Sequence, residues 1–531
     1  RDRQALGEMA QATLARWHGY KVSPVYHLLP NLPEPEWRRL LVEGRNEFNA
    51  ALQRWSQCIE VARRKHRPGD ILVLADETPT WALRLEAHRL AGKALLQLGQ
   101  FRLALDEYET ALTLDPNDLE SHRQKAILLG RLGRPEQARA EIQALLEVHP
   151  NDPESWGLLG RVEKEAWISR WRFPGQTPDQ TPDQTPAQTT SAMRACASAE
   201  LALLGEAIEP YMTAFILDTD HFYSGINAVT LRHLQGHLGG GEGKHPISLP
   251  DLEGGVTWAC LAALQRTPKA YWARVSYADM CVLLADADSV AHAYAHAAAA
   301  AGKDGFALDS TRQQLLLLRD LEFRPEVVAR ALTVIEREIA GCEPPLRPRQ
   351  VLLFSGHMLD KPGRVTPRFP PAQEVIAAQA IAALLDELGA GPDDLALCGG
   401  ACGGDILFAE ACLVRGVQVQ LHIQFEEPAF LAASVAFAGP RWVERYDQIK
   451  ARATLRVQPE ELGPVPVGVD PYERNNLWQL YTALSLGPER VRFIGLWDGQ
   501  SGEGAGGTQH MVATVRRHAG RAYILDTRSL W

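Results

Sequence analysis

The sequence lacks any long apolar run. None of its 531 residues lies in a stretch of the roughly 18 to 20 consecutive apolar side chains that a membrane-spanning helix needs. The N-terminus lacks the charged-then-apolar pattern of a secretory signal. Cysteine is scarce, and the eight residues form no CxxC pair, which argues against a disulfide framework and fits reduced thiols. We therefore expect a cytoplasmic protein that has no membrane partner.

Basic residues do not outnumber acidic ones, and several catalytic motifs are absent. With 55 basic against 65 acidic residues the formal net charge is -10, which argues against DNA or RNA as the main partner. No GxSxG elbow and no HExxH helix occurs, so serine hydrolases and zinc proteases have no support. Two histidine pairs, His233 with His237 and His292 with His296, have the i, i+4 spacing of metal ligands. Because no third ligand is evident, we expect no metal site.

A period of 34 residues is present in the first third of the chain. A glycine, an alanine and a proline recur at this distance, as Gly99 and Gly133, Ala104 and Ala138, and Pro116 and Pro150. This is the period of tetratricopeptide repeats, in which each unit is a pair of helices. We expect the glycine to end the first helix, the alanine to allow close packing, and the proline to stop the second helix. Such pairs must stack into a solenoid, whose concave surface would bind a protein partner.

A low-complexity segment follows the repeats. Residues 176–187 read QTPD-QTPD-QTPA, a polar and proline-punctuated sequence that has nothing to bury. We interpret residues 173–195 as a flexible linker. It separates an N-terminal helical and tetratricopeptide domain at 1–172 from a second helical region at 196–345, and a further domain occupies 346–531.

The second helical region has apolar residues at helical spacing in seven segments: 201–218, 224–238, 256–265, 270–285, 289–301, 310–321 and 325–342. It also contains Tyr211, Phe215, the block YSGIN at 223–227, and Tyr271-Trp272. Together with the repeats it resembles, over about residues 85 to 342, the TRAFs-binding or TPR-S helical region of apoptosis signal-regulating kinases and many bacterial proteins. The resemblance implies a scaffold, but the signature elements of a kinase domain are absent. We expect Tyr211, Phe215, Tyr223 and Trp272 to be packing residues, and Asn227 to tie two helices together.

The pattern changes to alternating strands and helices from Gln350 onward. Six short strands are predicted, at 351–355, 395–398, 417–423, 454–457, 490–497 and 521–525. Amphipathic helices lie between them, notably at 371–388, 404–415, 471–486 and 508–518. This alternation predicts a parallel sheet covered on both faces, as in a Rossmann-like domain. The whole chain is therefore predicted as an all-α tetratricopeptide-type solenoid followed by an α/β domain.

Three loops at the carboxyl ends of the predicted strands form a candidate ligand site. Ligands of open α/β sheets bind at this edge, where glycines let backbone N–H groups and helix N-termini approach an anion. The ligand predicted in this way is a nucleotide or a similar phosphate ester. The candidate ligand-binding residues are Ser355, Gly356, His357, Arg364 and Arg368 in the first loop, Gly399, Gly400, Gly403, Gly404 and Asp405 in the second, and Asp498, Gly499, Gly506, Gly507 and Thr508 in the third.

These loops resemble those of the SLOG superfamily of Rossmann-like domains, which includes LOG-type phosphoribohydrolases, DprA-like proteins and nucleotide-sensing modules of bacterial conflict systems. The resemblance rests on SGH at 355–357, GGxxGGDxxxAE at 399–410 and GGT at 506–508. It implies a nucleotide or NAD-derived ligand, with no certain cofactor. Met511 stands where the LOG-type signature has its catalytic glutamate. The catalytic residues of an enzyme are therefore unknown, with Asp405, Glu410 and Asp498 as candidates.

Three functions are open at this point. In the first, the chain is a sensor or scaffold in bacterial stress or antiviral signalling: the C-terminal domain binds a nucleotide or NAD-derived ligand, and the helical repeats bind a protein partner or self-assemble. In the second, the same pocket hydrolyses the N-glycosidic bond of a nucleotide or of NAD. In the third, the chain is an interaction scaffold without a ligand. The sequence does not fix the oligomeric state, and a homo-oligomer fits all three.

Overall fold

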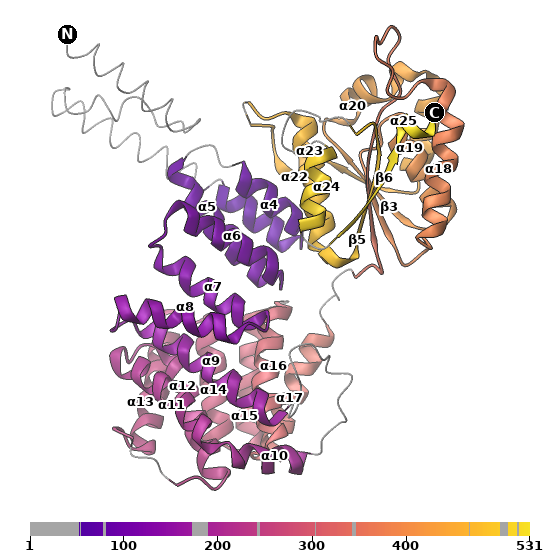
Figure 1. The fold of residues 1–531 in the computed structure, drawn as a ribbon. Helices are drawn as coiled ribbons and strands as arrows, with labels where there is room; N and C mark the ends of the chain where they lie inside the picture. The colour runs from indigo at the N-terminus through magenta and orange to yellow at the C-terminus, as the bar shows by residue number, and fades with distance from the viewer. Residues whose placement is uncertain are drawn as a thin grey trace, which may run out of the picture. The chain divides into compact units, whose positions relative to one another are not determined.

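The structure is a computed structural model (Figure 1). It describes residues 53, 55–77, 81–172, 190–241, 245–302, 304–341, 347–466, 468–499, 508–517 and 520–531. The QTPD repeat, Gly506 and Gly507 lie outside these ranges. Within these ranges, every helix is too short or too polar to cross a bilayer.

The 34-residue period corresponds to pairs of helices. α5 (Trp81–Gln97) and α6 (Phe101–Leu114) are joined by a short turn at Gly99, α7 (Leu119–Arg131) and α8 (Pro135–Val148) are joined in the same way at Gly133, and α9 (Pro153–Arg172) follows. Gly99 and Gly133 have φ angles of 72° and 73°, which glycine adopts without strain. Ala104 and Ala138 have no exposed surface. The predicted roles of the glycine and the alanine are therefore confirmed in both units.

Among the described residues, eight helices lie between the QTPD segment and the first strand. They are α10 (Thr190–Ala199), α11 (Leu201–Leu217), α12 (Phe222–His237), α13 (Leu249–Arg266), α14 (Tyr271–Leu284), α15 (Ala287–Ala301), α16 (Gly305–Asp320) and α17 (Pro325–Ala340). α10 begins inside the stretch predicted as linker. α9 packs along α11, where a Cβ atom on Gly160 would lie 2.7 Å from the ring of Tyr211. Helices before and after the QTPD segment therefore share one hydrophobic core.

The chain divides into two compact units, one from Ala104 to Pro344 and one that combines Arg1–Leu103 with Pro345–Trp531. We call them the helical unit and the sheet unit. This division differs from the predicted segments 1–172, 173–195, 196–345 and 346–531, because α9 shares a core with α11 and because α4 (Pro68–Asp76) packs in the sheet unit. Periodicity shows where helices begin and end, but it does not show which neighbour a helix packs against.

The sheet unit contains a six-stranded parallel sheet. Its strands are β1 (Val351–Gly356), β2 (Leu395–Cys398), β3 (Gln418–Ile423), β4 (Thr454–Val457), β5 (Val491–Trp497) and β6 (Arg521–Asp526). Their order is β4-β3-β2-β1-β5-β6, and all neighbouring pairs are parallel, as predicted. The chain runs outward from β1 to β4 and then returns to β5 on the other side of β1. This reversal between β1 and β5 is where open α/β sheets bind ligands.

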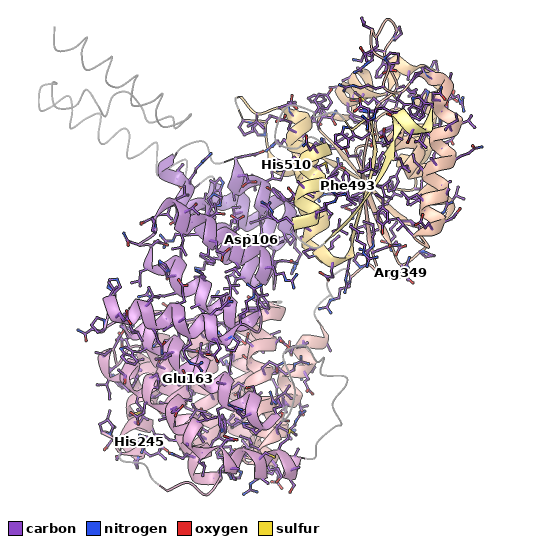
Figure 2. The ribbon with its side chains drawn as sticks, in the orientation of Figure 1. Asp106, Glu163, His245, Arg349, Phe493 and His510 are labelled. Carbon is purple, nitrogen blue, oxygen red and sulfur yellow. The ribbon has the colours of Figure 1, made fainter. Side chains whose placement is uncertain are left out.

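Helices cover both faces of this sheet (Figure 1). One face packs against α18 (Glu374–Glu387), α19 (Gly404–Val414) and α21 (Pro440–Lys450), and the other against α23 (Pro471–Ser485) and α24 (Thr508–Arg517). Leu352 of β1 belongs to the first core, whereas Leu353 and Phe493, the latter labelled in Figure 2, belong to the second. Burial on both faces explains why β1 reads as a continuous apolar run. Sequence analysis did not name α21 or the short helices α20 (Glu427–Ser434), α22 (Gln458–Leu462) and α25 (Thr527–Leu530).

α4 lies against α23 within the sheet unit. A Cβ atom on Gly69 would lie 2.5 Å from Oγ1 of Thr482, so only glycine allows this approach without a shift. The carboxylate of Asp70 is buried, and it accepts hydrogen bonds from Nε1 of Trp478 at 2.6 Å and Nη2 of Arg456 at 2.9 Å. α4 is thus held to the sheet unit by a buried ion pair as well as by close packing.

Candidate functional site

A cavity of about 630 Å³ lies at the carboxyl ends of the strands. Its walls come from the loops after β1, β2, β3 and β5 and from the first turns of α23. This is the edge at which the sequence placed a ligand site, and the cavity includes the reversal of strand order between β1 and β5. The predicted residues that line it are Ser355, Gly356, His357, Arg364, Arg368, Gly399, Asp405 and Asp498.

Three basic side chains of the loop after β1 line this cavity. Arg364 places Nε 3.4 Å from Oδ1 of Asp360, and Arg368 places Nε 3.6 Å from Oδ2 of Asp498. Lys361, which sequence analysis missed, has its ammonium group 5.0 Å from the centre of the Phe437 ring. The two arginine side chains remain 41% and 44% exposed, so their guanidinium groups are accessible to an anion in the cavity.

His357 connects the loops after β1 and β5. Its Nε2 atom lies 3.3 Å from the backbone nitrogen of Asp498 and 3.6 Å from Oδ1 of the same residue. Burial lowers the pKa of the imidazole below its ordinary value, and the nearby arginines act in the same direction. We conclude that His357 is neutral at pH 7 and accepts the Asp498 N–H through Nε2. The neutral imidazole of His357 therefore lines the cavity without adding positive charge to it.

The glycine-rich loop after β2 is packed against the loop after β1. A Cβ atom on Gly403, whose φ is 100°, would lie 2.8 Å from the backbone nitrogen of Leu359. The amide of Gly404 donates to the carbonyl of His357 at 3.1 Å, and the amide of Cys402 donates to the carbonyl of Ser434 at 2.9 Å. These two amides are therefore used within the protein. The glycines of this loop allow the two loops to pack closely, which differs from the expected phosphate cradle. Gly400, Gly403 and Gly404 do not line the cavity.

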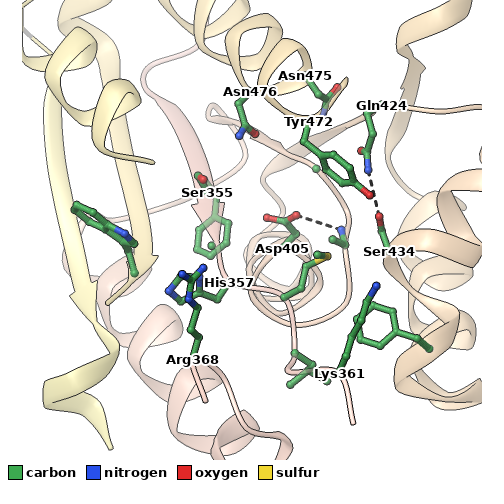
Figure 3. A pocket seen from close by; sticks show the side chains of 18 of the residues that line it. Ser355, His357, Lys361, Arg368, Asp405, Gln424, Ser434, Tyr472, Asn475 and Asn476 are labelled. Carbon is green, nitrogen blue, oxygen red and sulfur yellow. Dashed lines mark hydrogen bonds between the residues drawn. The ribbon is translucent and has the colours of Figure 1, made fainter. Parts of the chain in front are cut away.

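Asp405 lies between His357 and Ser434 in the cavity (Figure 3). Its side chain accepts the backbone N–H of Ala401 at 3.2 Å, and the residue is 9% exposed. Burial raises the pKa of the carboxyl group to about 7. Gly399 is needed beside it, because a Cβ atom there would lie 2.9 Å from Oδ2 of Asp405. The group therefore exchanges a proton near neutral pH, which is the property of a general acid or base.

Amide and hydroxyl side chains form another wall of the cavity. Nδ2 of Asn475 donates to the carbonyl of His422 at 2.7 Å, and Nε2 of Gln424 donates to Oγ of Ser434 at 3.2 Å. Asn475 does not cap α23, because the side chain of Asp470 accepts the first amides of this helix. The residues of this wall are Gln424, Ser434, Tyr472, Asn475, Asn476 and Gln479. Gln424, Ser434, Tyr472 and Gln479 were missed, because they lie outside the glycine motifs that guided the prediction.

The other predicted residues lie elsewhere. Glu410 is bound by Arg445 through two hydrogen bonds, at 2.7 and 2.5 Å, and does not line the cavity. A Cβ atom on Gly499 would lie 2.7 Å from Nη2 of Arg528. Thr508 begins α24, and Gly506 and Gly507 lie outside the described residues. Of the three catalytic candidates, the structure brings Asp405 and Asp498 to the cavity and gives Glu410 an ion pair instead.

The histidine pairs have partners other than a metal. His233 lies 2.7 Å from a carboxylate oxygen of Glu253, and His237 lies 2.9 Å from the carbonyl oxygen of Leu321. His292 and His296 face each other with their Nε2 atoms 3.0 Å apart. In the part of the chain that the structure describes, no group of three His, Cys, Asp or Glu side chains is placed to hold a metal ion.

Comparison with known proteins assigns part of the helical region. Residues 100–232 match the model of the TPR-S family, whose name is Tetratricopeptide Repeats-Sensor. The matched range includes the second helix pair, α9 and the YSGIN block. The expected tetratricopeptide-type helical region is therefore confirmed. No curated protein matches the chain.

Several solved tetratricopeptide structures are similar to parts of the chain. TTC0263, a thermophilic TPR protein from Thermus thermophilus, is 18% identical with a TM-score of 0.30, over 44% of this chain and 99% of that one. A tetratricopeptide repeat protein from Parabacteroides merdae is 12% identical with a TM-score of 0.26, over 54% and 99%. A human IFIT1 dimer with m7Gppp-AAAA is 10% identical with a TM-score of 0.25, over 84% and 94%.

Proposed function

We propose that the chain is a ligand-responsive scaffold whose sheet unit binds a nucleotide or NAD-derived ligand and whose helical repeats bind a protein partner. The observation that carries this proposal is the cavity at the strand ends, which combines basic and amide side chains. Arg364, Arg368 and Lys361 line it and are suited to phosphate oxygens. Amide groups such as those of Asn475 and Gln424 also line it and are suited to a base or ribose.

α23 supports the idea that ligand binding is coupled to the repeats. Asn475 and Gln479 on this helix line the cavity, whereas Trp478 and Arg474 contact α4 through Asp70 and Glu77. α4 leads along the chain into α5 and the repeats. A ligand that shifts α23 therefore changes the surface on which α4 is held. Coupling of this kind needs a ligand that binds the two arrangements with different affinity. The setting we propose is bacterial stress or antiviral signalling, which follows from the SLOG-like loops.

The carboxyl group of Asp405 supports the alternative function, an N-glycosidase. Its pKa of about 7 lets it donate a proton to a departing base or take one from water. Asp498, also at the cavity, is a second carboxylate that would stabilise positive charge on the sugar. The missing glutamate at the position of Met511 speaks against the LOG-type reaction.

The test uses the full chain with AMP, ATP, NAD and ADP-ribose. We expect at least one of them to raise the melting temperature, since a ligand at a hundred times its Kd adds about 2.7 kcal/mol to stability. No free base should appear on chromatography. The double variant Arg364→Gln/Arg368→Gln should weaken binding by about tenfold or more, because charge-assisted hydrogen bonds are lost. Arg441→Gln is the matched control, because this arginine is 72% exposed and does not line the cavity.

Three outcomes decide between the functions. If a probe binds to wild type and to Arg441→Gln but weakly to the double variant, the cavity is the binding site. If free base is released and Asp405→Asn stops its release, the enzyme alternative replaces the sensor. If no probe stabilises the protein, the nucleotide proposal is wrong and the scaffold without a ligand is favoured.

A further inference from the structure

A second cavity, of about 430 Å³, lies within the helical unit. It is lined by side chains of α7, α9, α12, α14 and α16, and it is separate from the proposed site in the sheet unit. Charged side chains from α7, α9 and α14 line it. The basic ones are Arg131, Arg161, Lys164 and Arg172, and the acidic ones are Glu165 and Asp279.

Lys164 is held at this cavity by neutral groups. Its ammonium group donates to Oδ1 of Asn227 at 2.8 Å and to Oε1 of Gln314 at 2.9 Å. Asn227 in turn donates through Nδ2 to the carbonyl of Tyr223 at 2.9 Å, so it ties α9 to α12 as predicted. An ammonium group has three N–H donors, and these two amide oxygens bring no negative charge. A partly buried ammonium group in such surroundings is stabilised by an anion.

The other charges leave the cavity positive. Glu165 pairs with Arg161 at 3.0 Å, and Arg172 pairs with Asp320, which does not line the cavity. Asp279 accepts a hydrogen bond from the buried hydroxyl of Tyr294, and burial raises its pKa to about 7, so at neutral pH it carries only part of a negative charge.

Burial and mutual repulsion lower the pKa values of two of the basic groups. Burial, followed by repulsion from Arg161, lowers the pKa of Arg131 to about 10 and that of Lys164 to about 8. Like charges that are held close together at a partly buried site cost free energy, and a bound anion removes this cost.

Aromatic side chains line the same cavity. Trp272 is 51% exposed and Tyr223 is 37% exposed, so both are accessible in the cavity, although each also packs against a neighbouring tyrosine ring. Tyr211 and Phe215 are buried, as expected. Tyr271, the residue before Trp272, holds α14 to α16. Its hydroxyl group forms hydrogen bonds with the carbonyl of Ala307 at 3.0 Å and with Oγ1 of Thr311 at 2.6 Å. The indole is thus left accessible beside the basic groups, where a planar ring can stack on it.

We propose that this cavity binds a small organic anion that carries a planar ring. Its negative group lies against Lys164, Arg161 and Arg131, and its ring lies against Trp272 or Tyr223. Phosphorylated nucleosides have this chemistry, as do other aromatic phosphates. The inference does not depend on the site in the sheet unit, since no residue lines both cavities.

The test measures binding of AMP, ADP-ribose and pyrophosphate to the full chain by calorimetry. Lys164→Met, which removes the charge and keeps an unbranched side chain, should weaken binding of AMP or ADP-ribose by about tenfold or more. Arg170→Gln is the matched control, because this arginine is exposed on the same helix and does not line the cavity. Lys164→Arg should restore part of the affinity if charge, and not only the geometry of α9, is what matters.

The contribution of the ring is tested separately. Trp272→Ala should weaken binding of AMP by about fivefold or more while leaving binding of pyrophosphate unchanged, since stacking on a base is worth about 1 to 3 kcal/mol. Trp258→Ala is its control, because Trp258 is 73% exposed on α13 and does not line the cavity. Retention of these effects in the Arg364→Gln/Arg368→Gln background assigns them to the helical unit.

Three results would overturn the inference. The first is that none of the three probes binds. The second is that Lys164→Met binds them as tightly as Arg170→Gln does. The third is that all binding disappears in the Arg364→Gln/Arg368→Gln background, which would place it in the sheet unit. Circular dichroism of each variant separates a loss of binding from a loss of fold.

Discussion

The cavity of the sheet unit and the cavity of the helical unit are lined by similar chemistry but built in different ways. Both combine basic side chains with amide and aromatic groups. The first is formed mainly by loops at one edge of a parallel sheet, so its position follows from strand order. The second is formed by the sides of five helices, so its position depends on how these helices stack. A site at strand ends leaves a local sequence motif, whereas a site between stacked helices does not.

The largest effect is expected at the contact between α4 and α23, because α23 lines the first cavity and α4 packs against it. Asp70→Ala leaves the buried guanidinium of Arg456 without its carboxylate partner and removes the acceptor of the Trp478 N–H. Removing one member of a buried ion pair costs about 3 to 5 kcal/mol. We expect a loss of this size in the unfolding free energy of the sheet unit, measured by urea denaturation with tryptophan fluorescence.

A surface ion pair in the same unit is the control for Asp70. Asp386 pairs with Arg415 at 2.7 Å and is 69% exposed. Exposed pairs contribute about 1 kcal/mol or less, so Asp386→Ala should change stability little. If Asp70→Ala were equally mild, α4 would not be part of the wall that supports α23, and the proposed coupling would lose its physical basis.

The second cavity depends on the close packing of α9, which carries Arg161 and Lys164. Gly160→Ala places a methyl group 2.7 Å from the buried ring of Tyr211, which must shift. We expect destabilisation of the helical unit by about 1 to 3 kcal/mol, as for other overpacked sites. Gly205→Ala on α11 is the control, because no atom lies within 4 Å of the methyl group that alanine would add there. This second substitution should be neutral or stabilising by up to about 1 kcal/mol. Equal melting temperatures of the two variants would contradict this packing.

Titration of Asp405 in the first cavity makes the stability of the sheet unit depend on pH. The pKa of Asp405 is raised from 3.8 to about 7, so between these values the folded state holds a proton that the unfolded state has lost. The stability of the sheet unit should therefore fall as the pH rises, by up to about 1.4 kcal/mol per pH unit, and level off above pH 7. Asp405→Asn should remove this slope. Urea denaturation across this pH range measures it, and a variant that keeps the slope would show that another group titrates.

The fold was predicted more completely than the sites. Apolar runs such as that of β1 and the glycine at Gly99 have local causes, so the strands, the repeat helices and the strand-end location of the first cavity were identified. The glutamines of the amide wall, Gln424 and Gln479, were not, because nothing in the local sequence marks a glutamine as a cavity residue. The glycines Gly403 and Gly404 carried a strong motif, but the motif does not distinguish loop packing from anion binding.

The sequence by itself determined the period of the repeats and the alternation of strands and helices. It also marked the positions where a positive φ or a close approach requires glycine. These properties depend on side chains within a few turns of one another. The tertiary structure decided which helices share a core, that Glu410 is held in an ion pair, and that Lys164, Asn227 and Trp272 meet at one cavity. These contacts depend on packing between segments that are far apart in the chain. Local propensity and periodicity carry no information about such packing.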